Sequence, residues 1–244
     1  MFNWKEIAEK IEVPHHFSSD YDEECIACVF DDFVDELISK NGLDCQNGCT
    51  KAVFISDESD KVLKIPFFYR AIYNDGSYFD EELDDWVNDG DNSEYQFYSF
   101  KNAGCAGRDN YSIFLDTDND YCALEAAIYA NVEKNTNFAE LFAKTELLCE
   151  DKNGYPLYLQ EKVKTWSEES PTVDERNTAT QLQSIFYIDR SWLARAIHHY
   201  GEEKITSFLK WAQSSKLVND LHSGNLGYRE NGAPVILDYS GYYE

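Results

Sequence analysis

Apolar positions along the chain follow helical spacing in some segments and strand spacing in others, which predicts an α+β protein. Apolar residues three and four positions apart predict helices over 3–13 and 21–39. Two short apolar runs, 52–55 and 61–67, flank a polar turn and predict a hairpin. The first quarter of the chain is therefore expected to hold two helices followed by a sheet.

The same patterns continue through the rest of the chain. Composition favours a helix over 121–133, and apolar runs over 142–149 and 156–163 predict a second hairpin. Three more helices are expected near 178–188, 190–200 and 202–214.

The segment 218–241 is predicted to fold back on itself at Asn231-Gly232, a dipeptide typical of two-residue hairpin turns. In the register that such a turn sets, Pro234 falls in a pair without hydrogen bonds, so its missing N–H costs nothing. The same register places Asn225 opposite Asp238, with Cα atoms roughly 4.5 Å apart. The hairpin is expected to bring these two side chains together at its open end.

Asp220 lies just before this hairpin, so two carboxylates and one amide are expected around one point. Oxygen ligands of this kind suit Mg²⁺, which otherwise keeps water and phosphate in its coordination sphere. The alternative is a surface hairpin with ordinary polar turn residues, and the geometry of the hairpin alone does not decide between them.

The run from Asp220 to Asn225, Asp-Leu-His-Ser-Gly-Asn, resembles the catalytic loop of the protein-kinase-like fold in the form used by aminoglycoside phosphotransferases and related small-molecule kinases. Asp238-Tyr239-Ser240-Gly241 resembles the metal-binding segment that follows it, at the family's spacing. The resemblance implies that Asp220 orients or accepts the proton of the attacking hydroxyl. It also implies that Asn225 and Asp238 hold the metal that bridges the phosphates of ATP.

Lys64 lies in the middle of the apolar run 61–67, where a lysine needs either a route to solvent or an anion. The resemblance implies that Lys64 is the third-strand lysine that touches the α- and β-phosphates. The alternative is that Lys64 lies on the solvated side of an edge strand. A helix is expected to begin at Ser93, and the resemblance makes Glu94 in its first turn the acid that steadies Lys64. A first-turn acid favoured by the helix dipole is the alternative, and Glu81 and Glu82 are rival partners.

The resemblance also implies an ATP site, for which the chain offers Gly48 and Thr50 between the first two strands and backbone groups from Gln160 through Glu161 to Val163 at a hinge. There is no G-x-G-x-x-G motif. No activation loop or later helix follows the Asp238 segment, so we expect a reduced second lobe. The expected fold is two-lobed and kinase-like.

The first lobe is expected to comprise residues 1–163, an antiparallel sheet with a helical start and insertions. The second lobe, 164–244, is expected to be small and mainly helical and to carry the catalytic-loop-like hairpin. A polar connector over 166–177, which contains Ser170-Pro171, marks the boundary.

Composition narrows the classes of partner. The chain has 244 residues, of which 43% are hydrophobic, enough for two cores, and its formal charge of −25 argues against a nucleic-acid surface. The first residues form no long apolar run, so no signal peptide or membrane span is expected. Seven cysteines, an odd number, favour reduced thiols and a cytoplasmic protein. A nucleotide and a protein are the expected partners.

Four of the cysteines, Cys25, Cys28, Cys45 and Cys49, have a spacing like that of zinc ligands. The first pair also lies along the apolar face of the helix predicted over 21–39, where cysteine packs as a small hydrophobe. Both interpretations stay open at this stage.

Two functions from different classes follow. The chain is a phosphotransferase that uses ATP and Mg²⁺, or it is a catalytically inactive kinase-like module (a pseudokinase) that acts by protein contact through its acidic surface. A third interpretation, an acidic mimic of nucleic acid, rests on net charge alone.

Overall fold

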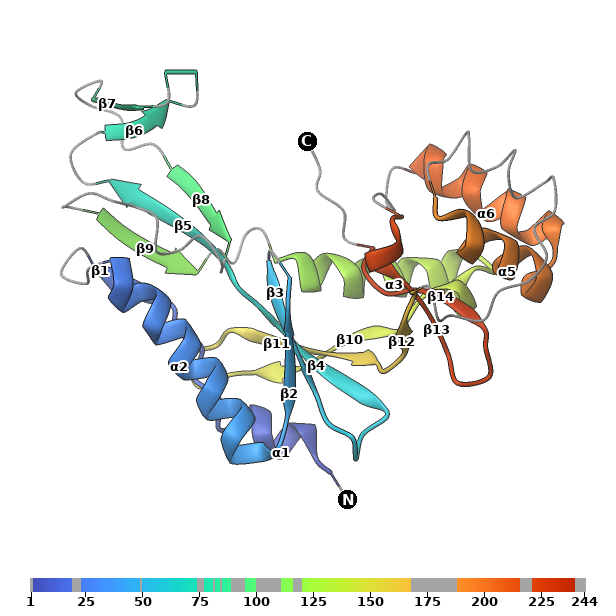
Figure 1. Cartoon of the computed structure of the whole chain (residues 1–244), viewed down its shortest axis with the longest axis horizontal. Helices are drawn as coiled ribbons and strands as arrows, with labels where there is room; N and C mark the ends of the chain where they lie inside the picture. Colours follow the sequence, from blue (N-terminus) through green and yellow to red (C-terminus); the bar gives the residue numbers. More distant parts are fainter. Residues whose placement is uncertain are drawn as a thin grey trace. The chain divides into compact units, whose positions relative to one another are not determined.

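The structure is a computed structural model of the 244-residue chain. It describes residues 2–18, 23–48, 50–73, 77–80, 82–83, 85–88, 95–99, 111–115, 120–167, 188–215 and 221–239. The fold is α+β, as predicted, with an antiparallel five-stranded sheet and several helices (Figure 1). The chain forms two compact units, Met1–Asp120 with Leu147–Leu159, and Tyr121–Glu146 with Gln160–Glu244.

The main sheet has the strand order β10-β11-β4-β3-β2, and most of its residues belong to the first unit. Its strands confirm both predicted hairpins and extend the sheet by one strand. Their bounds are β2 (Asp44–Asn47), β3 (Lys51–Ile55), β4 (Lys61–Pro66), β10 (Thr145–Glu150) and β11 (Pro156–Glu161).

The core of the first unit lies between this sheet and the helices α1 (Trp4–Ala8) and α2 (Glu23–Asn41) (Figure 1). Phe54 and Leu63 are fully buried in it. The first helix is shorter than the predicted 3–13, because the chain after it tightens into bonds from Lys10 N to Ile7 O and from Ile11 N to Ala8 O and then leaves the helical path. The Val13 amide donates to Asp151 Oδ2 at 2.8 Å, and Pro14 disfavours a helical conformation of the residue before it.

A second sheet, in the order β1-β9-β5-β8, also belongs to the first unit, beside a hairpin of β6 and β7. The strands are β1 (His16–Ser18), β5 (Phe68–Tyr73), β6 (Ser77–Asp80), β7 (Asp85–Asn88), β8 (Tyr95–Ser99) and β9 (Tyr111–Leu115). The prediction of a helix that begins at Ser93 is therefore wrong. Its aromatic residues have high strand propensity, and pairing with β5 decides the outcome.

The second unit contains α3 (Tyr121–Asn135), η2 (Ala139–Leu141), α5 (Arg190–Tyr200), α6 (Glu202–Ser215) and η3 (Ser223–Asn225). A three-stranded sheet of β12 (Lys164–Thr165), β13 (Leu226–Tyr228) and β14 (Pro234–Ile236) completes it. These helices confirm the predictions for 121–133, 190–200 and 202–214. Of the helix predicted over 178–188, residues 178–187 lie outside the described residues. Trp192 and Phe208 are fully buried in its core.

The hairpin of β13 and β14 forms as predicted, but its register differs by one residue. Tyr228 pairs with Pro234, and Arg229 N donates to Ala233 O at 2.9 Å. The loop therefore has three residues and ends at Gly232, whose φ of 78° is the left-handed conformation that such loops require. Pro234 still occupies a pair without hydrogen bonds, because the alternation now starts from the bonded pair of Arg229 and Ala233.

Candidate functional site

The open end of this hairpin brings the two predicted metal ligands, Asn225 and Asp238, together. The backbone oxygen of Asn225 accepts from Leu237 N at 2.8 Å and from Asp238 N at 3.3 Å. The residue paired with Asn225 is thus Leu237 and not Asp238, which is the consequence of the shifted register. Asp238 follows immediately and its N–H also donates to the Asn225 oxygen, so the backbones of the two residues are neighbours at this end.

The loop before Asn225 is shaped by a local hydrogen bond. His222 Nδ1 accepts from Gly224 N at 3.0 Å, and Asn225 N donates to His222 O at 2.9 Å. A Cβ atom on Gly224 would lie 2.9 Å from the His222 ring, so only glycine fits this turn without a shift. Asp220, the predicted proton acceptor, lies outside the described residues.

Asp238 is fixed through its two neighbours in the chain. Gln160 Nε2 donates to Leu237 O at 2.8 Å and to Thr145 Oγ1 at 2.9 Å. On the other side, the Tyr239 hydroxyl donates to Ala143 O at 2.9 Å and lies 2.9 Å from Thr145 Oγ1. Burial raises the pKa of Tyr239 well above its usual value, so this hydroxyl keeps its proton.

A buried carboxylate, Glu125, belongs to the same cluster, and sequence reasoning missed it. It is fully buried, and its Oε2 lies 3.4 Å from Thr145 Oγ1 and 3.5 Å from Gln160 Nε2. The signal was present in the sequence, because Glu125 lies on the same helix face as Cys122, Ile128 and Val132, which are all buried. An acid within an apolar helix face marks a group that the fold must accommodate.

Lys64, in the first unit, is only 2% exposed. It lies on β4, which is a central strand between β3 and β11. Leu63 and Ile65 pack in the core, so alternation along the strand directs Lys64 to the opposite face of the sheet, which is also covered there. The alternative of a lysine on a solvated edge strand is therefore wrong.

Gly48 and Thr50 flank the turn between β2 and β3, as predicted for the nucleotide loop. The Gly48 amide donates to Lys51 O at 2.9 Å, and Thr50 O accepts from Phe67 N at 2.7 Å. Both backbone groups are thus engaged within the sheet. Glu94, the predicted acid partner of Lys64, lies outside the described residues and directly before strand β8.

The predicted hinge residues Glu161 and Val163 belong to the second unit. Glu161 N donates to Lys144 O at 2.9 Å, and its carboxylate binds Arg229 through Nε at 2.6 Å and Nη2 at 2.9 Å. Arg229 also donates to the backbone oxygens of Glu140 and Phe142. Glu161 therefore ties the β13–β14 hairpin to β11, and Val163 is half-buried beside it.

Of the four cysteines with zinc-like spacing, the structure describes only the side chain of Cys45. Cys45 forms no disulfide within the described residues and is half-buried, and burial raises the pKa of its thiol to about 11. Within the described ranges, no three His, Cys, Asp or Glu side chains are grouped closely enough to hold a metal ion.

No helix in the part of the chain that the structure describes is long and apolar enough to cross a membrane. No protein-family model matches the chain, and no curated protein matches it either.

Proposed function

We propose that this protein is a two-lobed, kinase-like phosphotransferase that binds ATP with Mg²⁺ and transfers the γ-phosphoryl group to a hydroxyl acceptor in the cytoplasm. The observation that supports the proposal most is the backbone contact of Asn225 with Asp238 at one end of a hairpin, inside a motif that resembles a kinase catalytic loop. Nothing in the comparisons with known proteins bears on the proposal.

In this proposal each site residue has a separate role. The amide oxygen of Asn225 and the carboxylate of Asp238 are hard oxygen donors, which fit Mg²⁺. The ion would neutralise charge that develops on the phosphate oxygens. Asp220 would orient the acceptor hydroxyl and take its proton, and Lys64 would contact the α- and β-phosphates.

The acid expected on a helix is reassigned within the proposal. The segment after Glu94 is a strand, whereas Glu125 is a fully buried carboxylate on α3, the helix that precedes the β10–β11 hairpin. We therefore propose Glu125 in place of Glu94 as the helical acid of the kinase-like arrangement. Glu125→Gln keeps the shape and the hydrogen bonds and removes the charge, so it should lower turnover more than it lowers stability.

Nucleotide binding is tested by the melting temperature with ATP and MgCl₂, because a ligand of the folded state raises the midpoint. ATP at a hundred times its dissociation constant should stabilise the wild type by about 2.7 kcal/mol. Asp238→Ala should lose most of this gain. Glu203→Ala, which removes an exposed carboxylate from the first turn of α6 and none of the residues proposed for the site, should keep it. A wild-type midpoint unchanged at millimolar ATP would contradict the proposal.

Catalysis needs a separate assay, ATP turnover in the wild type and in Asp220→Asn. Loss of a general base typically lowers the rate by about 10²–10⁴-fold. Equal turnover in the two proteins would exclude the role proposed for Asp220.

The second candidate is an inactive kinase-like interaction module. One observation favours it, namely that the Gly48 amide and the Thr50 carbonyl are already bonded within the sheet and no glycine-rich motif replaces them. In that case ATP would give no shift, or a shift with no turnover. The acidic surface would then be the part that a protein partner recognises.

A further inference from the structure

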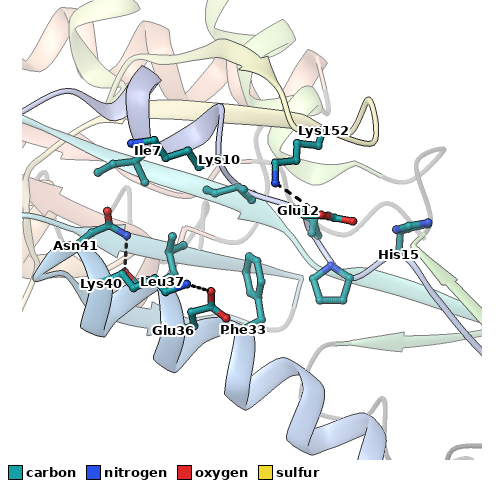
Figure 2. Close-up of a pocket in the computed structure, with 13 residues that line it drawn as sticks. Ile7, Lys10, Glu12, His15, Phe33, Glu36, Leu37, Lys40, Asn41 and Lys152 are labelled. Atoms are coloured by element: carbon teal, nitrogen blue, oxygen red, sulfur yellow. Dashed lines mark hydrogen bonds and ion pairs between the residues drawn. The ribbon is translucent and has the colours of Figure 1, made fainter.

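A cavity of about 750 Å³ opens in the first unit, within the size range of sites for small ligands. Figure 2 shows that Phe33 and Leu37 extend from α2 toward side chains of α1 and of the segment that follows α1. We call four apolar lining residues the apolar floor: Ile7, Ile11, Phe33 and Leu37. Three lining lysines form what we call the lysine rim: Lys10, Lys40 and Lys152.

The walls of the cavity are fixed by contacts that do not require a ligand. The Asp151 carboxylate accepts from Val13 N at 2.8 Å, from Asn153 N at 2.7 Å and from Tyr155 N at 2.9 Å. These bonds join the segment after α1 to the turn between β10 and β11. On the other wall, Phe33 makes an edge-to-face contact with buried Phe67, at 5.8 Å between ring centroids. The cavity is therefore preformed.

Lysines outnumber glutamates among the residues that line the cavity, whereas acidic residues outnumber basic ones in the whole chain. Three of the 13 lining residues are lysines and two are glutamates, whereas the whole chain has 21 basic and 46 acidic residues. The lining is therefore less acidic than the rest of the chain, and three lysines around one cavity offer an anion several cationic groups.

The rim lysines are available because their present partners hold them weakly. Lys10 pairs with Glu6 at 3.1 Å, Lys152 pairs with Glu12 at 3.9 Å, and Lys40 pairs with Glu36. All three lysine side chains are more than half exposed, and ion pairs at such sites contribute little. An anion that enters the cavity can replace a carboxylate at small cost.

We propose that this cavity binds an amphipathic anion, whose apolar body lies on the apolar floor and whose carboxylate or phosphate group faces the lysine rim. The site lies wholly in the first unit. It is independent of the proposed phosphotransferase function and makes no use of Asn225, Asp238 or Lys64.

The test is a ligand-observed NMR titration of the full chain with octanoate and octyl phosphate, with octan-1-ol as the uncharged control. At least one anion should bind saturably and more tightly than octan-1-ol. Shortening the chain toward butyrate should weaken binding by roughly fourfold for each methylene lost from the apolar floor.

Charge at the rim is tested by the triple variant Lys10→Gln, Lys40→Gln and Lys152→Gln. Loss of three exposed charge contacts should lower affinity for the anion about tenfold and leave binding of octan-1-ol unchanged. The matched control, Lys5→Gln with Lys134→Gln and Lys210→Gln, changes net charge equally at exposed lysines outside the cavity and should bind as the wild type does.

Three results would overturn the proposal. The first is that neither anion binds saturably at millimolar concentration. The second is that the anions bind no better than octan-1-ol. The third is that the rim variant and the control variant weaken binding equally. Because all six substituted lysines are exposed, a melting curve for each variant verifies that the fold is intact.

Discussion

Polar groups are used differently at the hairpin of the second unit and at the cavity of the first. Around Asp238, the side chains of Thr145, Gln160 and Tyr239 are buried and joined by hydrogen bonds of 2.8–2.9 Å. Around the cavity, the charged side chains are exposed pairs within or between surface elements. Burial makes an unmatched polar group costly, whereas water replaces a partner lost at the surface. The buried cluster around Asp238 therefore fixes the position of the hairpin end, whereas the exposed pairs around the cavity leave charged groups available to a ligand.

The largest effect is expected for Gln160→Leu. This change removes the amide that donates to Leu237 O and to Thr145 Oγ1. Each buried acceptor that is left without a donor lowers the free energy of unfolding by about 1–3 kcal/mol. We expect a loss of about 2–4 kcal/mol in the free energy of unfolding, measured with urea. Gln160→Met, which keeps the length of the side chain but lacks the amide donor, is the matched variant. A loss below about 1 kcal/mol in both would show that the cluster does not hold the Asp238 segment.

A smaller effect is expected for Arg229→Met, because its pair with Glu161 is only partly buried, with exposed fractions of 23% and 31%. We expect about 1–2 kcal/mol of destabilisation, after allowance for screening by solvent. A double-mutant cycle with Glu161→Gln isolates the pair. Additive effects of the two changes would mean that the ion pair does not tie the hairpin to β11.

Stability at high pH should depend on Tyr200. Burial raises the pKa of its hydroxyl from 10.0 to about 12, and the hydroxyl donates to Pro234 O at 2.8 Å. The folded state holds this proton more tightly than the unfolded state, so the stabilisation is complete below pH 10 and is lost as pH rises toward 12. Unfolding free energies between pH 9 and 12 should fall less steeply in Tyr200→Phe. Equal slopes in the two proteins would contradict the assignment.

The smallest effect is expected at the lysine rim. Lys40→Gln breaks an exposed pair with Glu36 within α2, and such pairs contribute about 0.3–0.5 kcal/mol. The urea midpoint should therefore hardly move. A loss above about 1 kcal/mol would remove the distinction between the buried and the exposed region.

Local patterns predicted the elements well where a segment's own residues decide its structure. The β3–β4 and β10–β11 hairpins and the helices α5 and α6 follow from apolar spacing and polar turns. The strand at 95–99 was missed because pairing with β5 overrides a weak helical pattern. The register of the last hairpin was missed by one residue because Asn231-Gly232 also fits a three-residue loop with a left-handed Gly232.

The candidate site was predicted in part. The approach of Asn225 to Asp238 followed from the hairpin, which is a local feature of the chain. The contact of Gln160 with Leu237 joins residues 77 positions apart, and no spacing rule reaches that far. Glu125 was missed because its helix was predicted from composition alone, whereas the helical spacing of Cys122, Ile128 and Val132 marks the buried face on which it lies.

Calorimetric titration with ATP, in MgCl₂ and in EDTA, tests the central claim most directly when applied to the wild type and to Asp238→Asn, which keeps the side chain's size and removes its charge. The account predicts saturable binding in the wild type that weakens at least tenfold without Mg²⁺, and a much smaller dependence on Mg²⁺ in the variant. ATP binding that is absent, or that is equal with and without Mg²⁺ in both proteins, would contradict it.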